Sequence, residues 1–122
     1  HKTSHWIWFI FPQLKGLGHS RYSQYYGLAD ADETHTFLAN SCLNERLREI
    51  TNALLIHKDR NIESLMGSSI DALKLKSCMT LFDAISPNDI FGKVLETFYD
   101  GKKDKNTVQK IGKTLKGHTS NN

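Results

Sequence analysis

Amphipathic helical stripes separated by capping and breaking residues extend from residue 30 to about residue 115, and this pattern constrains the fold more than any other feature. The clearest stripe lies over residues 42–57, where four apolar residues share one helical face: Leu43, Leu47, Ile50 and Leu54. No segment alternates apolar and polar residues with the two-residue period of a strand. No Asn-Gly or Asp-Gly turn joins two strand-like runs. The sequence therefore predicts an all-α protein, a single compact domain of six or seven short helices.

Capping and breaking residues divide the stripes into separate helices. Asp30, with Glu33 three residues later, predicts a helix over residues 31–39. Ser41 is expected to cap the helix over residues 42–57. Four more helices are predicted: residues 61–66, ended by Gly67; residues 71–85, opened by Ser69 or Asp71 and ended by Ser86-Pro87; a helix capped by Asn88 or Asp89 and ended by Gly101; and residues 106–115.

The N-terminal quarter of the chain has a different character. Residues 3–11 are apolar on every side, and we predict a buried helix there that ends at Pro12. Residues 12–29 form a long loop with several glycines and tyrosines, and a loop of this length in a compact domain often carries function. We expect one all-helical domain over residues 1–116 and a flexible tail over residues 117–122.

Length and composition limit the chain to one domain. Its 122 residues, 39% of them hydrophobic, suffice for a single core and argue against disorder. The longest apolar run, residues 6–11, is far shorter than the roughly 18–20 apolar residues of a membrane-spanning helix. Cys42 and Cys78 form no disulfide framework and no metal-binding pattern. We therefore expect two reduced thiols, packed against apolar neighbours, in a cytoplasmic protein.

Positive charge is concentrated at the C-terminal end. The net charge is +3, but residues 101–122 alone carry +5 and residues 1–100 carry about −2. The only acidic residue of the C-terminal stretch is Asp104, and its six lysines are Lys102, Lys103, Lys105, Lys110, Lys113 and Lys116. No nucleic-acid motif accompanies these lysines, so we interpret them as a solvated helix face and tail.

Two strings carry a resemblance to a known family. Residues 4–13 (SHWIWFIFPQ) and residues 71–82 (DALKLKSCMTLF) resemble hallmarks of the family called domain of unknown function 1810, or Rv1873-like. Shorter matches follow at ordered spacing over nearly the whole chain: residues 14–18, 25–28, 43–48 and 98–101, then Asp104 and Thr107. The resemblance implies an all-helical fold and a mainly bacterial, cytoplasmic setting. It implies no reaction, because the family has none assigned to it.

The chain also departs from the family pattern at three points. The family usually has a helix before the first string, and we expect this chain to lack it. Asn44 stands where glycine is typical, and Cys78 stands where a second serine is typical. The missing helix affects the completeness of the core and of the wall of any pocket.

The N-terminal quarter holds four candidates for a ligand site, in which polar groups lie among aromatic rings. His5 can act as an acid or base near neutral pH, or can hold the first helix in place, which is the more frequent role. Trp6 can stack on a ring-shaped ligand or pack in the core, and packing is again more frequent. Gln13 can donate to a phosphate or tie down the loop, and Tyr26 lies on that loop.

Four further candidates lie on predicted helices. Lys74 and Ser77, one helical turn apart, can act as base and nucleophile, although Lys-x-x-Ser reverses the order of the Ser-x-x-Lys enzymes. Asp71 can bind a ligand or cap its helix. Arg46 can bind an anion, although ion pairs of Arg46 and Arg48 with Glu45 and Glu49 are the default expectation. The more frequent interpretation of the first three residues is structural: Asp71 caps the helix, Lys74 is solvated and Ser77 packs against its neighbours.

These candidates together favour a ligand-binding domain. We expect a small nucleotide-like ligand, with hydrolysis as a further option, in a cleft between residues 4–13 and the helix of residues 71–82. The alternative is a non-enzymatic module that binds a protein through the aromatic loop of residues 14–28. The sequence has no convincing metal-ligand spacing and no complete glycine-rich phosphate loop, so we expect neither a metal nor a cofactor. Nucleic acid and membranes are not expected partners, and the oligomeric state stays open.

Overall fold

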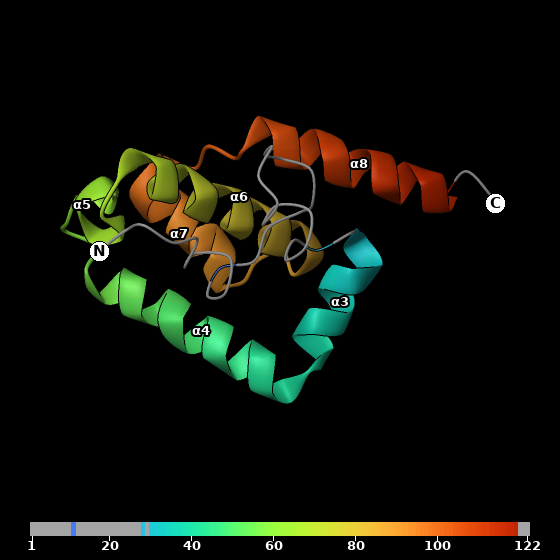
Figure 1. The fold of residues 1–122 in the computed structure, drawn as a ribbon, viewed down its shortest axis with the longest axis horizontal. Helices are drawn as coiled ribbons and strands as arrows, with labels where there is room; N and C mark the ends of the chain where they lie inside the picture. The colour runs from blue at the N-terminus through green and yellow to red at the C-terminus, as the bar shows by residue number, and fades with distance from the viewer. Residues whose placement is uncertain (1–10, 12–27, 29, 120–122) are drawn as a thin grey trace.

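The computed structural model describes Phe11, Leu28 and residues 30–119, and of residues 113–119 it describes the backbone alone. Its helices keep the labels of Figure 1. They are α3 (Ala31–Ala39), α4 (Ser41–Ile56), α5 (Ile62–Met66), α6 (Ser69–Ile85), α7 (Ile90–Tyr99) and α8 (Lys105–Thr119). The all-α prediction is confirmed.

Helix α6 is the centre of the arrangement. It packs against α3, α5, α7 and α8, while α4 packs against α3 and α7. In Figure 1, α8 runs along the upper edge, α4 runs along the lower edge, and α6 and α7 lie between them. A helix in this position buries more than one face, and residues 78–82 of α6 are buried without interruption.

An aromatic cluster forms the middle of the core. The ring centroid of Phe82 on α6 lies 5.5 Å from that of Phe37 on α3 and 5.5 Å from that of Phe91 on α7. These spacings are typical of favourable aromatic pairs. Phe82 thus joins three helices, and Leu75, Met79 and Phe82, which follow one another by one helical turn on α6, are fully buried.

The helix boundaries follow the predicted cap pattern closely, with two corrections. Asp30 Oδ1 accepts a hydrogen bond from Glu33 N at 2.9 Å, as predicted. The predicted cap of α4, Ser41, is wrong, because Asn40 Oδ1 accepts from Leu43 N at 3.0 Å. Helix α6 begins at Ser69, one of the two residues predicted to open it, but its cap is Ser68, whose Oγ accepts from Asp71 N at 3.1 Å. In both places adjacent polar residues compete, and the one with extended backbone becomes the cap.

The C-terminal helix is longer than predicted. Helix α8 begins at Lys105 and extends to Thr119, beyond the predicted range of residues 106–115. The preceding helix ends through two successive left-handed residues, Asp100 (φ 56°) and Gly101 (φ 76°), of which only the glycine was predicted.

The two cysteines lie in different environments. Both are free thiols, and Cys78 is fully buried on α6. Cys42 is exposed in the first turn of α4, so the prediction that it packs against apolar neighbours is wrong. The next residue, Leu43, is also 38% exposed, because this end of α4 turns its predicted apolar face partly toward solvent. In the described part of the chain, no helix combines the length and apolar character needed to cross a bilayer.

Candidate functional site

Half of the predicted site lies outside the described residues. His5, Trp6, Gln13 and Tyr26 belong to this half, and so does most of the loop of residues 14–28. Phe11, from the first string, is described and is 2% exposed, so this residue belongs to the core. The expected cleft between the two strings therefore stays a prediction.

The four remaining candidates are described, and they do not line the hollows discussed below. Lys74 and Ser77 are half-buried on α6, and within the described structure no hydrogen bond joins them. Asp71 is 9% exposed in the first turn of α6, and Arg46 is exposed on α4. Three hollows, described next, lie along α6.

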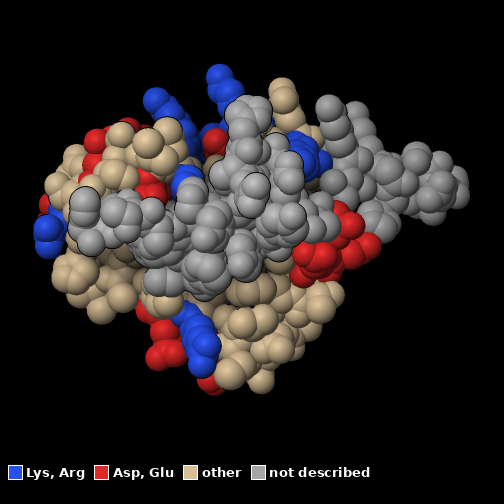
Figure 2. Space-filling view, in the orientation of Figure 1, with Lys and Arg blue, Asp and Glu red and all other residues tan. Residues whose placement is uncertain are grey.

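A hollow of about 530 Å³ between α6 and the start of α8 has lysines on several sides. We call it the basic hollow, and its lining residues are Lys76, Lys102, Lys103, Asp104, Lys105 and Asn106. In Figure 2, Lys and Arg side chains project from the upper edge of the molecule, above the connection between α7 and α8. The basic hollow thus concentrates positive charge where that connection crosses α6.

A chain of hydrogen bonds through Thr80, Asp104 and Thr107, which we call the relay, fixes the position of the basic hollow. Thr80 Oγ1, on α6, donates to Lys76 O at 2.8 Å and accepts from Asp104 N at 2.9 Å. Asp104 Oδ2 in turn accepts from Thr107 N at 2.9 Å and from Thr107 Oγ1 at 2.6 Å, which caps α8. Thr80 is 1% exposed and Thr107 is fully buried. The relay therefore holds the lysines of the connection beside Lys76.

Removing one hydroxyl should test this relay. Thr80→Val is expected to lower the free energy of unfolding by about 1–2 kcal/mol, because the half-buried Asp104 N loses its acceptor, Thr80 Oγ1. Urea unfolding of the wild type and the variant measures the change. The matched control is Thr36→Val, on an exposed threonine that bonds only within its own helix, to Asp32 O at 3.0 Å. We expect a change below about 0.5 kcal/mol there, and equal losses would contradict the relay.

The lysines of the basic hollow keep most of their charge available. Asp104, its only acidic residue, uses Oδ2 to cap α8. Lys103 Nζ lies 3.5 Å from Asp83 Oδ2, but the Lys103 side chain is 54% exposed, so this pair is weak. Among the described residues, Lys76, Lys102 and Lys105 form no ion pair. The hollow therefore has a net attraction for anions.

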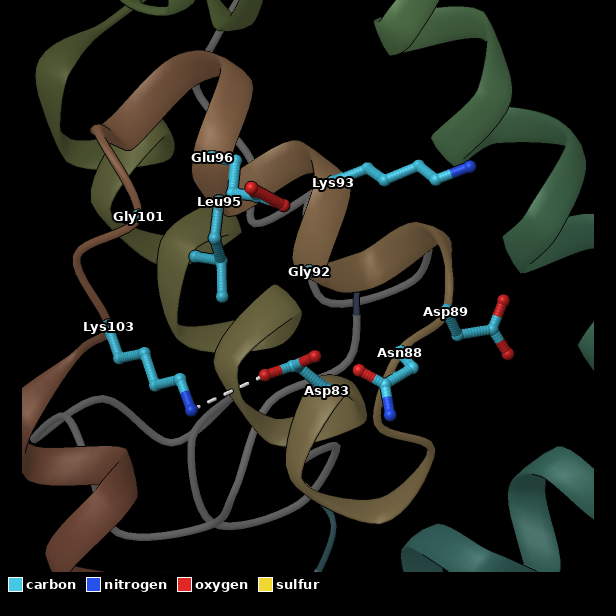
Figure 3. A pocket seen from close by; sticks show the side chains of 9 residues that line it. All are labelled: Asp83, Asn88, Asp89, Gly92, Lys93, Leu95, Glu96, Gly101 and Lys103. Atoms are coloured by element: carbon cyan, nitrogen blue, oxygen red, sulfur yellow. Dashed lines mark ion pairs between the residues drawn. The ribbon is translucent and has the colours of Figure 1, made fainter.

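The second hollow has both acidic and basic side chains and no clear preference for a ligand of either charge. It measures about 400 Å³ and is lined by residues of α6, α7 and the two connections around α7: Asp83, Asn88, Asp89, Gly92, Lys93, Leu95, Glu96, Gly101 and Lys103. Figure 3 shows Lys103 reaching across it toward Asp83. Because three acidic and two basic side chains alternate around it, this hollow is a weaker candidate than the basic hollow.

Gly92 leaves room for the Asp83 carboxylate beside this second hollow. A Cβ atom at residue 92 would lie 2.8 Å from Asp83 Oδ1, which is closer than real Cβ contacts. Glycine at this position therefore allows the Asp83 carboxylate to lie against the backbone of α7.

The third hollow, of about 360 Å³, is lined by aromatic rings and by Lys76. We call it the aromatic hollow; it is lined by Asn61, Ile62, Glu63, Ser69, Ala72, Leu73, Lys76, Phe98 and Tyr99. Tyr99 Oη donates to Ala72 O at 2.6 Å, and Lys76 Nζ lies 5.9 Å from the centroid of the Tyr99 ring. Burial, with smaller effects of Cys78 and Glu63, raises the pKa of the Tyr99 hydroxyl. Tyr99 is therefore a neutral phenol that is fixed in place.

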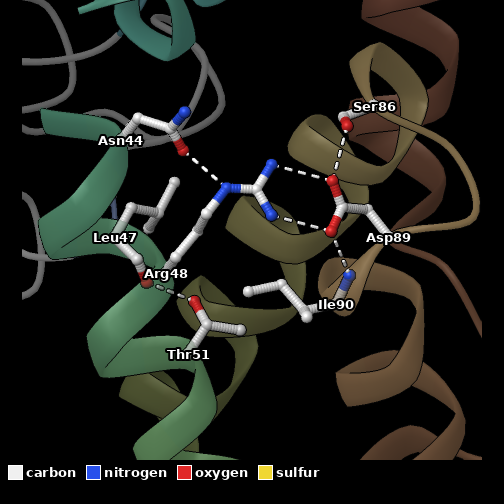
Figure 4. Close-up of polar contacts among 7 residues, drawn as sticks. All are labelled: Asn44, Leu47, Arg48, Thr51, Ser86, Asp89 and Ile90. Atoms are coloured by element: carbon white, nitrogen blue, oxygen red, sulfur yellow. Dashed lines mark hydrogen bonds and ion pairs between the residues drawn. The ribbon is translucent and has the colours of Figure 1, made fainter. Parts of the chain in front are cut away.

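Arg48 belongs to a polar network that supports the fold (Figure 4). Its guanidinium donates two hydrogen bonds to the Asp89 carboxylate, at 2.7 and 2.8 Å, and one to Asn44 Oδ1 at 2.6 Å. Asp89 also accepts from Ser86 Oγ at 2.8 Å and from Ile90 N at 2.7 Å. The default expectation of pairs with glutamates on α4 is thus wrong for Arg48, because Asp89 presents both oxygens across α4 and α7. Asn44 orients the guanidinium.

The basic and aromatic hollows were missed from the sequence. Lys76 lies two residues after the predicted candidate Lys74, on another side of a helix that buries most of its surface. The C-terminal charge was the available signal, but it was interpreted as a solvated face. Within the residues that the structure describes, no group of three His, Cys, Asp or Glu side chains could hold a metal ion.

Comparison with known proteins is consistent with this architecture. The model of the family described as "protein of unknown function (DUF1810)" matches residues 1–111. The chain belongs to this DUF1810 family. It is similar to the conserved hypothetical protein Rv1873 from Mycobacterium tuberculosis, whose crystal structure superposes with a TM-score of 0.83 at 38% sequence identity. That match covers 92% of this chain and 80% of Rv1873. Comparison with curated proteins gives no match.

Proposed function

We propose that this DUF1810 domain binds a small phosphorylated ligand in the basic hollow. The observation that carries the proposal is that Lys76, Lys102, Lys103 and Lys105 surround one hollow of about 530 Å³. This volume is within the usual range for small-molecule sites, which is roughly 300–1,000 Å³. Several ammonium groups around one space suit the distributed charge of a phosphate chain.

Binding is better supported than hydrolysis. Hydrolysis would need an activated nucleophile or water, and the predicted pair of Lys74 and Ser77 has no mutual hydrogen bond in the described structure. Lys102, Lys103 and Lys105 are exposed cations and Lys76 is half-buried beside them, which suits recognition of an anion. We place the domain in the cytoplasm, where phosphorylated metabolites are abundant and where its two free cysteines stay reduced.

A charge-matched pair of variants tests the proposal. In isothermal titration with sodium tripolyphosphate, Lys102→Gln/Lys105→Gln is expected to weaken binding about tenfold, or about 1.4 kcal/mol. Lys58→Gln/Arg60→Gln removes the same charge from exposed residues between α4 and α5, and should change the Kd less than about twofold. An equal loss in both variants would show attraction by net charge alone. Absence of tripolyphosphate binding by the wild type at millimolar concentration would contradict the proposal.

A further inference from the structure

The aromatic hollow has the composition of a subsite for a ring. Its apolar wall comes from three helices: Ile62 on α5, Ala72 and Leu73 on α6, and Phe98 and Tyr99 on α7. Leu73 is 59% exposed although it is a leucine in a central helix. Mostly apolar walls with a few polar groups are typical of sites that bind amphipathic small molecules.

The Tyr99 ring is held in a fixed position. Its hydroxyl is bonded to Ala72 O at 2.6 Å, which ties α7 to the first half of α6. The hydroxyl is therefore already engaged, and the ring is what Tyr99 contributes to the hollow. A fixed ring loses little conformational freedom when a ligand binds to it.

Lys76 lines both the aromatic hollow and the basic hollow, so the two are adjacent. We propose that the aromatic hollow binds the base of a nucleotide whose phosphates lie in the basic hollow. This proposal rests on the proposed function. Lys76 then lies between base and phosphates, where its ammonium group can contact the first phosphate.

The distribution of charge sets the orientation of this ligand. Glu63, the acidic residue of the aromatic hollow, repels phosphates and can accept hydrogen bonds from amino or hydroxyl groups of a nucleoside. The side-chain oxygen of Asn61 accepts from Glu63 N at 2.9 Å and Ser64 N at 3.3 Å, which leaves its amide nitrogen as a donor. Carboxylate and amide thus face the base, while the lysines face the phosphates.

Two probes separate this inference from the proposed function. ATP has a base and tripolyphosphate has none, so the wild type should bind ATP about tenfold more tightly, since stacking on an aromatic side chain strengthens base binding by this order. Leu73→Ala/Phe98→Leu should weaken ATP binding about tenfold and change tripolyphosphate binding less than twofold. The control is Ile70→Ala, a 63% exposed residue of α6 that does not line the hollow.

Each outcome decides one of the two proposals. Equal affinity of the wild type for ATP and tripolyphosphate would overturn the base subsite and leave the phosphate site standing. A double variant that loses affinity for both probes alike would also overturn the subsite, with circular dichroism confirming that it is folded. If the wild type binds neither probe, the proposed function fails and the subsite fails with it.

Discussion

Phe82→Ala is expected to lower the free energy of unfolding by about 3–5 kcal/mol, the usual range for a large aromatic residue removed from a core. Phe82 is fully buried, and its ring contacts Phe37 on α3 and Phe91 on α7. Alanine leaves a cavity where three helices meet and removes two aromatic contacts. Urea unfolding followed by circular dichroism measures the loss, and the variant is expected to be close to unfolded at 37 °C.

Two further variants on α6 show whether the loss of stability comes from packing or from helix propensity. Phe82→Leu keeps most of the volume and should cost clearly less than the alanine variant. Leu73→Ala changes an exposed residue of the same helix and should cost less than about 1 kcal/mol. If Phe82→Ala cost no more than Leu73→Ala, the packing at the centre of the fold would be contradicted.

Asp89→Ala is expected to lower the free energy of unfolding by about 2–3 kcal/mol. It removes the cap of α7, typically about 1 kcal/mol, and leaves Arg48 without its bidentate partner. The two side chains are 33% and 25% exposed, so the loss is smaller than for a fully buried pair. Asp89→Asn should keep the cap and recover part of the loss, which urea unfolding at pH 7 can measure.

The stability that Asp89 contributes depends on pH. The hydrogen bond from Arg48, with those from Ile90 N and Ser86, holds the pKa of the Asp89 carboxyl well below its ordinary value. A lowered pKa in the folded state stabilises the fold above the ordinary carboxyl pKa of about 4, and this stabilisation is lost as the pH falls further. The difference between wild type and Asp89→Ala should therefore be full at pH 7 and smaller at pH 3. The control is Asp59→Asn, on an exposed residue, which should change stability by less than about 0.5 kcal/mol; a difference that does not depend on pH would contradict the ion pair.

Local sequence signals predicted the helices well. The helix predicted over residues 31–39 from Asp30 and Glu33 has the bounds of α3, and Gly67 ends α5, as expected, with a left-handed φ of 92°. These signals act within one helical turn, so they are visible in a single sequence. Where two polar neighbours compete, as Asn40 does with Ser41, the local pattern cannot separate them, and the predicted cap was one residue off.

The candidate site was harder to predict because it depends on contacts between distant segments. The bond between Thr80 and Asp104 joins residues that are 24 apart in the chain. No local pattern shows that it brings Lys76 beside the lysines of the connection. Helical periodicity identifies buried residues of α6 such as Leu75 and Met79, but residues on its other sides are buried too, so the pattern does not separate Lys76 from Lys74. The predictions on residues 4–13 and 14–28 remain predictions.

The close approach at Gly92 also restricts which residues can occupy this position. Any other residue would place its Cβ atom 2.8 Å from Asp83 Oδ1, so the carboxylate would have to turn away. Lys103 Nζ, which lies 3.5 Å from Asp83 Oδ2, would then lose this partner. Because Lys103 lines both the second hollow and the basic hollow, a change at Gly92 would alter the charge balance of both.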